Sequence, residues 1–145
     1  MSEGKIMYFL KTEHSFDAAH FLSGYQGKCA NLHGHRWRVV VEIQSETLEQ
    51  DRQKRGMIVD FGDFKRDLSE AVDFFDHAMI YEENTLRPAT VAALEDEGFR
   101  LIPVPFRPTA EHFAAYFSRR MTGMGYQVAR ATVYETPNNC ASYAE

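Results

Sequence analysis

The stretch His35-Arg36-Trp37-Arg38-Val39-Val40-Val41-Glu42-Ile43 carries the clearest strand pattern in the chain. Successive side chains of an extended strand leave opposite faces of a sheet. One face therefore carries Arg36, Arg38 and Glu42. The other face carries aromatic rings and branched apolar side chains, namely His35, Trp37, Val39, Val41 and Ile43. One apolar face and one charged face are typical of an antiparallel sheet with solvent on one side.

The residues before this stretch predict a partner strand. Residues 6–22 begin with an apolar run and then alternate around Phe16, Ala18 and His20. We expect the two strands to pair so that His20 meets His33 and His35 at one end of the sheet.

The residues after the stretch predict one long amphipathic helix. Residues 45–55 are polar and read as a turn, and residues 57–60 read as a short extended piece. From Gly62 or Asp63 onward, large apolar residues recur at helical spacing, namely Phe64, Leu68, Val72 and Phe75. This stripe predicts a helix that packs on the sheet.

The C-terminal half predicts two further helices and a hairpin. Residues 90–97 suggest a short helix, and the prolines of residues 99–106 favour an extended segment. Thr109 is a suitable N-cap for the next helix. The last expected elements are a strand over 126–136 and a return strand over 141–143.

These elements predict an α+β fold. The expected architecture is a four-stranded antiparallel sheet with helices packed on one face, in a single domain over 1–145. Such a sheet has two open edges, and open edges favour pairing with another subunit.

Composition narrows the class of protein. The chain has 145 residues, 44% of them hydrophobic, and a net charge of −5 without a basic run. This balance argues against nucleic acid or an anionic membrane as the main partner. The polar N-terminus does not resemble a signal peptide, and two cysteines are too few for a disulfide framework. We therefore expect a cytoplasmic protein.

Three histidines form the strongest candidate site. His33 and His35 are two residues apart, so both leave the same face of a strand, and Gly34 between them leaves the backbone free to adjust. With His20 they offer three imidazoles, and three protein ligands with one open position are usual for catalytic zinc. The sequence therefore predicts a Zn²⁺ site.

Cys29 leaves three interpretations open. It is either an ordinary buried thiol, a fourth ligand of a closed structural zinc site, or a reactive thiolate beside the metal. Spacing alone does not choose among them.

Other acidic and basic side chains allow both a structural and a functional interpretation. Asp76 and His77 either end a helix or form an acid–base pair. Glu135 is either a strand-end carboxylate or an acceptor for two N–H groups of a heterocycle. Glu111, next to the Thr109 cap, is explained most simply by the electrostatics of a helix N-terminus.

Together, several short motifs resemble the 6-pyruvoyl-tetrahydropterin synthase / 6-carboxy-tetrahydropterin synthase family. They occur in the family's order and span nearly the whole chain. They are Phe16-Asp17-Ala18-Ala19-His20, Cys29-x-x-x-His33-Gly34-His35, Val59-Asp60-Phe61-Gly62-Asp63-Phe64-Lys65, Phe75-Asp76-His77, Pro108-Thr109-Ala110-Glu111 and Val133-Tyr134-Glu135-Thr136. The short gap between Cys29 and His33 is similar to that of the bacterial 6-carboxy branch.

The resemblance implies a tunnelling fold, in which subunits join their sheets into a barrel as trimers or hexamers. It also implies site roles, and these are zinc binding by His20, His33 and His35, proton transfer by Cys29, Asp76 and His77, and substrate binding by Glu135 and Glu111.

The implied reaction is the zinc-dependent conversion of 7,8-dihydroneopterin triphosphate to 6-carboxy-5,6,7,8-tetrahydropterin, acetaldehyde and triphosphate, a step towards queuosine. Alternatives are 6-pyruvoyl-tetrahydropterin formation, an aldolase-like cleavage of dihydroneopterin, and a non-catalytic pterin- or purine-binding module with structural zinc. The chain departs from the family pattern in its long segment 82–106 and in His112, where the family often has asparagine.

Overall fold

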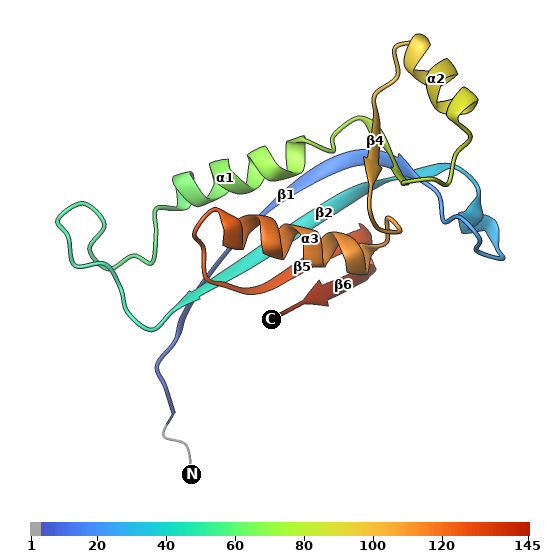
Figure 1. Ribbon diagram of the computed structural model, residues 1–145. Helices are drawn as coiled ribbons and strands as arrows, with labels where there is room; N and C mark the ends of the chain where they lie inside the picture. Colours follow the sequence, from blue (N-terminus) through green and yellow to red (C-terminus); the bar gives the residue numbers. More distant parts are fainter. Residues whose placement is uncertain (1–3) are drawn as a thin grey trace.

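A long curved sheet carries the other elements of the protein (Figure 1). The computed structural model describes residues 4–145. The strands are β1 (Tyr8–His20), β2 (His33–Ser45), β3 (Ala78–Glu82), β4 (Leu101–Val104), β5 (Val128–Thr136) and β6 (Asn139–Tyr143). The helices are α1 (Phe61–Asp73), α2 (Pro88–Asp96) and α3 (Ala110–Gly123), and a 3-10 turn, η1, spans Lys28–Ala30.

The sheet differs from the predicted one. It has six strands in the order β4-β3-β1-β2-β5-β6, and it is mixed because β3 runs parallel to both β1 and β4. The prediction of a four-stranded antiparallel sheet was therefore wrong. The five residues of β3 do not alternate regularly in burial, and only residues 74–77 separate them from α1. No period-two pattern therefore predicted the strand.

The pairing of the two long strands is as predicted. β1 and β2 are antiparallel along their whole length, with His20 opposite His33 and Ala18 opposite His35. This register brings all three histidines to one end of the sheet. Residues 57–60, predicted as extended, form no strand.

The core lies between one face of the sheet and helices α1 and α3, which lie on the same side in Figure 1. Phe16 is at its centre, stacked on Trp37 at 5.8 Å between ring centroids and in contact with Phe113 and Phe117 of α3. The inward residues of β2 are fully buried, so the alternation in the sequence correctly identified the core face.

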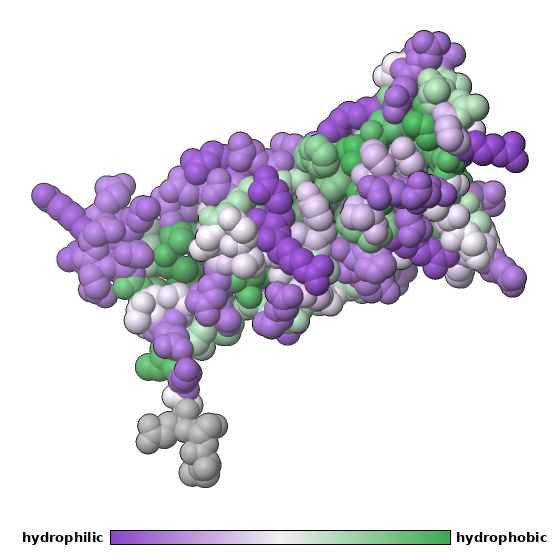
Figure 2. All heavy atoms as spheres, viewed as in Figure 1, coloured by the Kyte–Doolittle hydropathy of each residue, from purple (hydrophilic) through white to green (hydrophobic). Residues whose placement is uncertain are grey.

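Helix α2 departs from the predicted arrangement of helices on one face. It contacts β4, buries none of its residues and stands apart from α1 and α3 (Figure 1). Hydrophobic residues gather at this end of the molecule (Figure 2). No helix among residues 4–145 has the length and apolar character to cross a membrane.

Candidate metal centre

Three imidazoles and one carboxylate converge where β1, β2 and β5 meet. One ligand atom from each of His20, His33, His35 and Glu135 lies within 4.8 Å of the others. The strand register explains the convergence, since His20 and His33 are directly opposite each other and His35 follows on the same face. Glu135 reaches the cluster from β5, on the face that carries the buried Ala131 and Val133.

Backbone carbonyls fix the orientation of two of the rings. His20 Nδ1 donates to the carbonyl of Pro108 at 2.8 Å, and His33 Nδ1 donates to the carbonyl of Asn31 at 2.7 Å. With the proton on Nδ1, each ring presents a lone pair on Nε2, and these two nitrogens lie 3.1 Å apart. Such second contacts commonly orient histidine ligands of metals.

The electrostatics of the cluster favour the neutral form of two of the imidazoles, His20 and His35. Burial lowers the pKa of His20 to about 4, although the Pro108 carbonyl acts in the opposite direction. Burial also lowers the pKa of His35, against the attraction of Glu135. A neutral imidazole is the form that binds a metal.

One polar atom in the cluster lacks a hydrogen bond among residues 4–145. His35 Nε2 is buried and forms none, although Glu135 Oε1 lies 2.9 Å away. A divalent cation would satisfy all of these groups at once. They are the facing lone pairs of His20 and His33, the buried nitrogen of His35 and the carboxylate of Glu135. The donor set therefore fits a metal such as zinc.

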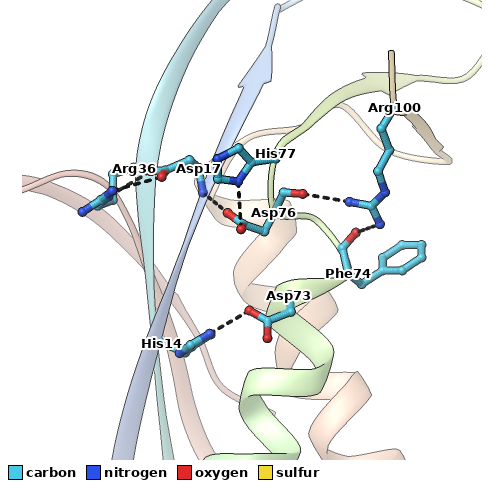
Figure 3. Close-up of polar contacts among 8 residues, drawn as sticks. All are labelled: His14, Asp17, Arg36, Asp73, Phe74, Asp76, His77 and Arg100. Carbon is cyan, nitrogen blue, oxygen red and sulfur yellow. Dashed lines mark hydrogen bonds and ion pairs between the residues drawn. The ribbon is translucent and has the colours of Figure 1, made fainter. Parts of the chain in front are cut away.

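A second cluster joins Asp17, Asp76 and His77 (Figure 3). Asp76 Oδ2 lies 2.9 Å from His77 Nδ1, and Asp76 Oδ1 accepts the backbone N–H of Asp17 at 2.8 Å. This N–H bond, more than the contact with His77, lowers the pKa of Asp76 below its usual range. The carboxylate therefore stays ionised and holds a proton on His77 Nδ1, which leaves Nε2 free.

The two clusters lie close to one cavity. A cavity of about 630 Å³ is lined mainly by apolar residues, and His35, Asp17 and His77 also line it. The His77 side chain is 79% exposed, so its ring is accessible to a ligand.

The remaining predicted site residues lie outside both clusters. Cys29 lies in η1, where its carbonyl accepts the N–H of Leu22, two residues after His20. Glu111 is exposed in the first turn of α3. Within residues 4–145 neither joins the metal cluster.

The residues that support these side chains were not predicted from the sequence. The carbonyls of Asn31 and Pro108 orient the rings, and Asp17 supports the Asp76–His77 pair. Backbone carbonyls have no sequence signature, whereas Asp17 adjoins the motif that contains His20.

The protein is thus an α+β protein, with helices covering a mixed sheet. At one end of this sheet, three imidazoles converge in a preformed candidate metal centre. Comparison with known proteins identifies its family. A family model described as 6-pyruvoyl tetrahydropterin synthase matches residues 9–145. The chain therefore belongs to the 6-pyruvoyl tetrahydropterin synthase family, as the motifs indicated, and is an enzyme of that family.

Two relatives and one solved structure illustrate the similarity. The chain is 36% identical over 142 residues to 6-carboxy-5,6,7,8-tetrahydropterin synthase of Haemophilus influenzae, covering 96% of this chain and 100% of that protein. It is 34% identical over 130 residues to the Rickettsia felis protein of the same name, covering 85% and 90%. The crystal structure of 6-pyruvoyl tetrahydropterin synthase from Plasmodium vivax superposes with a TM-score of 0.72 at 18% identity, covering 97% of this chain and 98% of that one.

Proposed function

We propose that the protein is a zinc-dependent lyase that converts 7,8-dihydroneopterin triphosphate and water to 6-carboxy-5,6,7,8-tetrahydropterin, acetaldehyde and triphosphate. The observation that carries the proposal is the convergence of three imidazoles on one point. The names of the bacterial relatives support the 6-carboxy product. The product would feed the formation of queuosine and related deazapurines.

The metal would be held by His20, His33 and His35. Zinc supplies Lewis acidity, which lowers the pKa of hydroxyl groups on the substrate side chain. The carbonyls of Pro108 and Asn31 keep the ring nitrogens aimed at that point. This orientation saves the free energy of arranging the ligands when the metal binds.

Proton transfer would involve Cys29, Asp76 and His77. A thiolate at Cys29 would take a proton from the substrate side chain, and the pterin would tautomerise. Asp76 holds the Nδ1 proton of His77, so Nε2 is the atom that would accept or return a proton beside the cavity.

Substrate recognition would involve Glu135 and Glu111. The Glu135 carboxylate could accept two adjacent N–H groups of the pterin ring. Its Oε1 atom lies 2.9 Å from His35 Nε2, beside the proposed metal ligands. Glu111, exposed at the start of α3, would contact the substrate at the mouth of the site.

Assembly into a barrel with the tunnelling fold is part of the proposal. The sheet ends in β4 on one side and β6 on the other, and these edges are where further subunits would pair.

The decisive experiment is incubation of the zinc-loaded protein with 7,8-dihydroneopterin triphosphate and identification of the products by mass. Acetaldehyde with 6-carboxy-5,6,7,8-tetrahydropterin is the expected result. A 6-pyruvoyl product would move the protein to the sibling activity. Release of glycolaldehyde that still carries the triphosphate would indicate aldolase-like cleavage. No turnover by folded, zinc-loaded protein would contradict the proposal.

The Cys29→Ala variant tests the binding-module alternative. We expect this variant to keep its zinc and lose activity, because Cys29 lies outside the group of converging ligand atoms. Loss of zinc together with folding would instead favour a structural metal closed by the thiolate.

A further inference from the structure

The turn that carries Asp76 and His77 has an unfavourable backbone conformation. His77 has φ of 57°, in the left-handed region that residues with a β-carbon rarely adopt. Such a conformation persists where surrounding contacts fix it, and it concentrates at functional sites. Two sets of contacts hold this turn in place.

The first set of contacts comes from β1. Asp17 accepts the backbone N–H of His77 at 2.7 Å through its carbonyl and donates its own N–H to Asp76 Oδ1 at 2.8 Å. The Asp17 carboxylate is itself held by two hydrogen bonds from Arg36 at 2.9 and 3.0 Å. Both the backbone of His77 and the side chain of Asp76 are thus tied to one residue of the sheet.

The second set of contacts comes from Arg100, the residue immediately before β4. Its guanidinium donates to the carbonyl of Asp76 at 2.8 Å and to the carbonyl of Phe74 (Figure 3). The same group lies 5.5 Å from the centroid of the Phe74 ring. Its backbone is fixed in turn, because the carbonyl of Arg100 accepts the N–H of Met79 in β3 at 3.0 Å.

One of the two carbonyls that Arg100 contacts belongs to Phe74, the C-cap of α1, where helical carbonyls lack partners and carry partial negative charge. The other belongs to Asp76, two residues further on in the turn. A planar guanidinium can donate to two acceptors at once, whereas an ammonium acts as a single point charge. Arg100 is therefore suited to fix the direction of the chain as it leaves α1 and enters the Asp76–His77 turn.

We propose that Arg100 is a positioning residue for the Asp76–His77 pair, acting through the carbonyls of Phe74 and Asp76. The inference rests on the proposed function only in that this pair transfers a proton. It also gives the segment 82–106 a role, because this segment returns the chain from β3 to the turn and delivers the guanidinium there.

The test compares Arg100→Ala with Arg87→Ala in steady-state kinetics with the natural sequence as reference. Arg87 is exposed in the same segment, and its side chain forms no hydrogen bond or ion pair among residues 4–145. Misplacement of a catalytic group by about 1 Å can cost about 100-fold in rate. We expect Arg100→Ala to lower kcat about 10- to 100-fold, KM to change less than about threefold, and Arg87→Ala to match the reference.

A second measurement separates positioning from folding. Added guanidinium ion at millimolar concentration should restore part of the kcat of Arg100→Ala, and Arg100→Lys should retain an intermediate kcat because it keeps one donor. An unchanged kcat in Arg100→Ala would overturn the inference. So would a rise in KM alone, or a loss of activity that neither guanidinium nor lysine relieves.

These outcomes are distinct from failure of the proposed function. If the natural sequence does not turn over 7,8-dihydroneopterin triphosphate, the substrate assignment fails. If it does and Arg100→Ala is as active, only the role of Arg100 fails.

Discussion

Two of the clustered histidines have one ring nitrogen committed to a backbone carbonyl, and this decides which nitrogen faces the metal. His20 uses Pro108, which is 88 residues away, and His33 uses Asn31, which is two residues away. Only the second contact is local in the sequence. At the residue scale, the site is therefore prepared partly by the loop around His33 and partly by the segment before α3.

The metal assignment predicts a selective loss of zinc on mutation. We expect His33→Ala to reduce bound zinc from about one ion per chain to less than about a tenth, because one of three imidazoles is lost. His14→Ala is the matched control, since His14 pairs with Asp73 outside the cluster. Elemental analysis of dialysed proteins measures this, and equal zinc in both variants would refute the ligand assignment.

The lowered pKa of His20 predicts that the metal-free protein weakens in acid. Folding holds the pKa of His20 at about 4, whereas an unfolded imidazole takes up its proton near pH 6.5. As the pH falls through this window, the unfolded state binds the proton first, so the free energy of unfolding decreases. A shift of this size corresponds to about 3 kcal/mol.

Urea unfolding of chelator-treated protein at pH 7.5 and pH 4.5 measures this effect. The His20→Gln variant serves as the control and should lose less stability over the same range. Equal losses in the two proteins would mean that other groups cause the acid sensitivity.

At the scale of elements, the N-terminus of α3 connects folding with the site. Thr109 Oγ1 accepts the backbone N–H of His112 at 3.3 Å, and the preceding residue, Pro108, supplies the carbonyl that orients His20. The cap therefore fixes the place where α3 begins and, with it, the position of a contact to the metal centre.

The Thr109→Ala variant should lose about 1 kcal/mol of unfolding free energy, because the first turn of α3 loses its side-chain acceptor. Thr109→Ser keeps a hydroxyl and should lose much less. Urea unfolding at pH 7.5 measures both, and a Ser variant as unstable as the Ala variant would point to the threonine methyl group rather than the cap.

At the scale of the whole molecule, the sheet has two edge strands that could pair with other subunits. Among residues 4–145, β4 and β6 each have one neighbouring strand, so each leaves backbone groups unpaired on its outer side. The polar outer face of the sheet carries the arginines that alternate with the core residues of β2.

We therefore expect size-exclusion chromatography with light scattering to give the mass of a trimer or a hexamer. Pairing of sheet edges between subunits would satisfy the unpaired backbone groups. Dilution to low micromolar concentration serves as the control for weak association. A monomer at every concentration would contradict assembly into a barrel.

Much of this fold could be predicted because its signals are local. The alternation over His35–Ile43 correctly predicted β2 and its buried face, and the helical stripe from Phe64 onward correctly predicted α1. Strand β3 was missed, and the segment 99–106 that contains β4 was predicted as extended but not as a strand of the sheet. Pairing in parallel depends on contacts between segments distant in the sequence and leaves no alternating pattern.

The sequence by itself determined the α+β class, the family and the meeting of His20 with His33 and His35, because spacing and strand register follow from the order of residues. Only the tertiary structure decided that Glu135 joins these histidines, that Pro108 orients one of them, and that Arg100 reaches the Asp76–His77 turn. Each of these contacts joins segments far apart in the chain, so packing of the core brings them together and no local pattern encodes them.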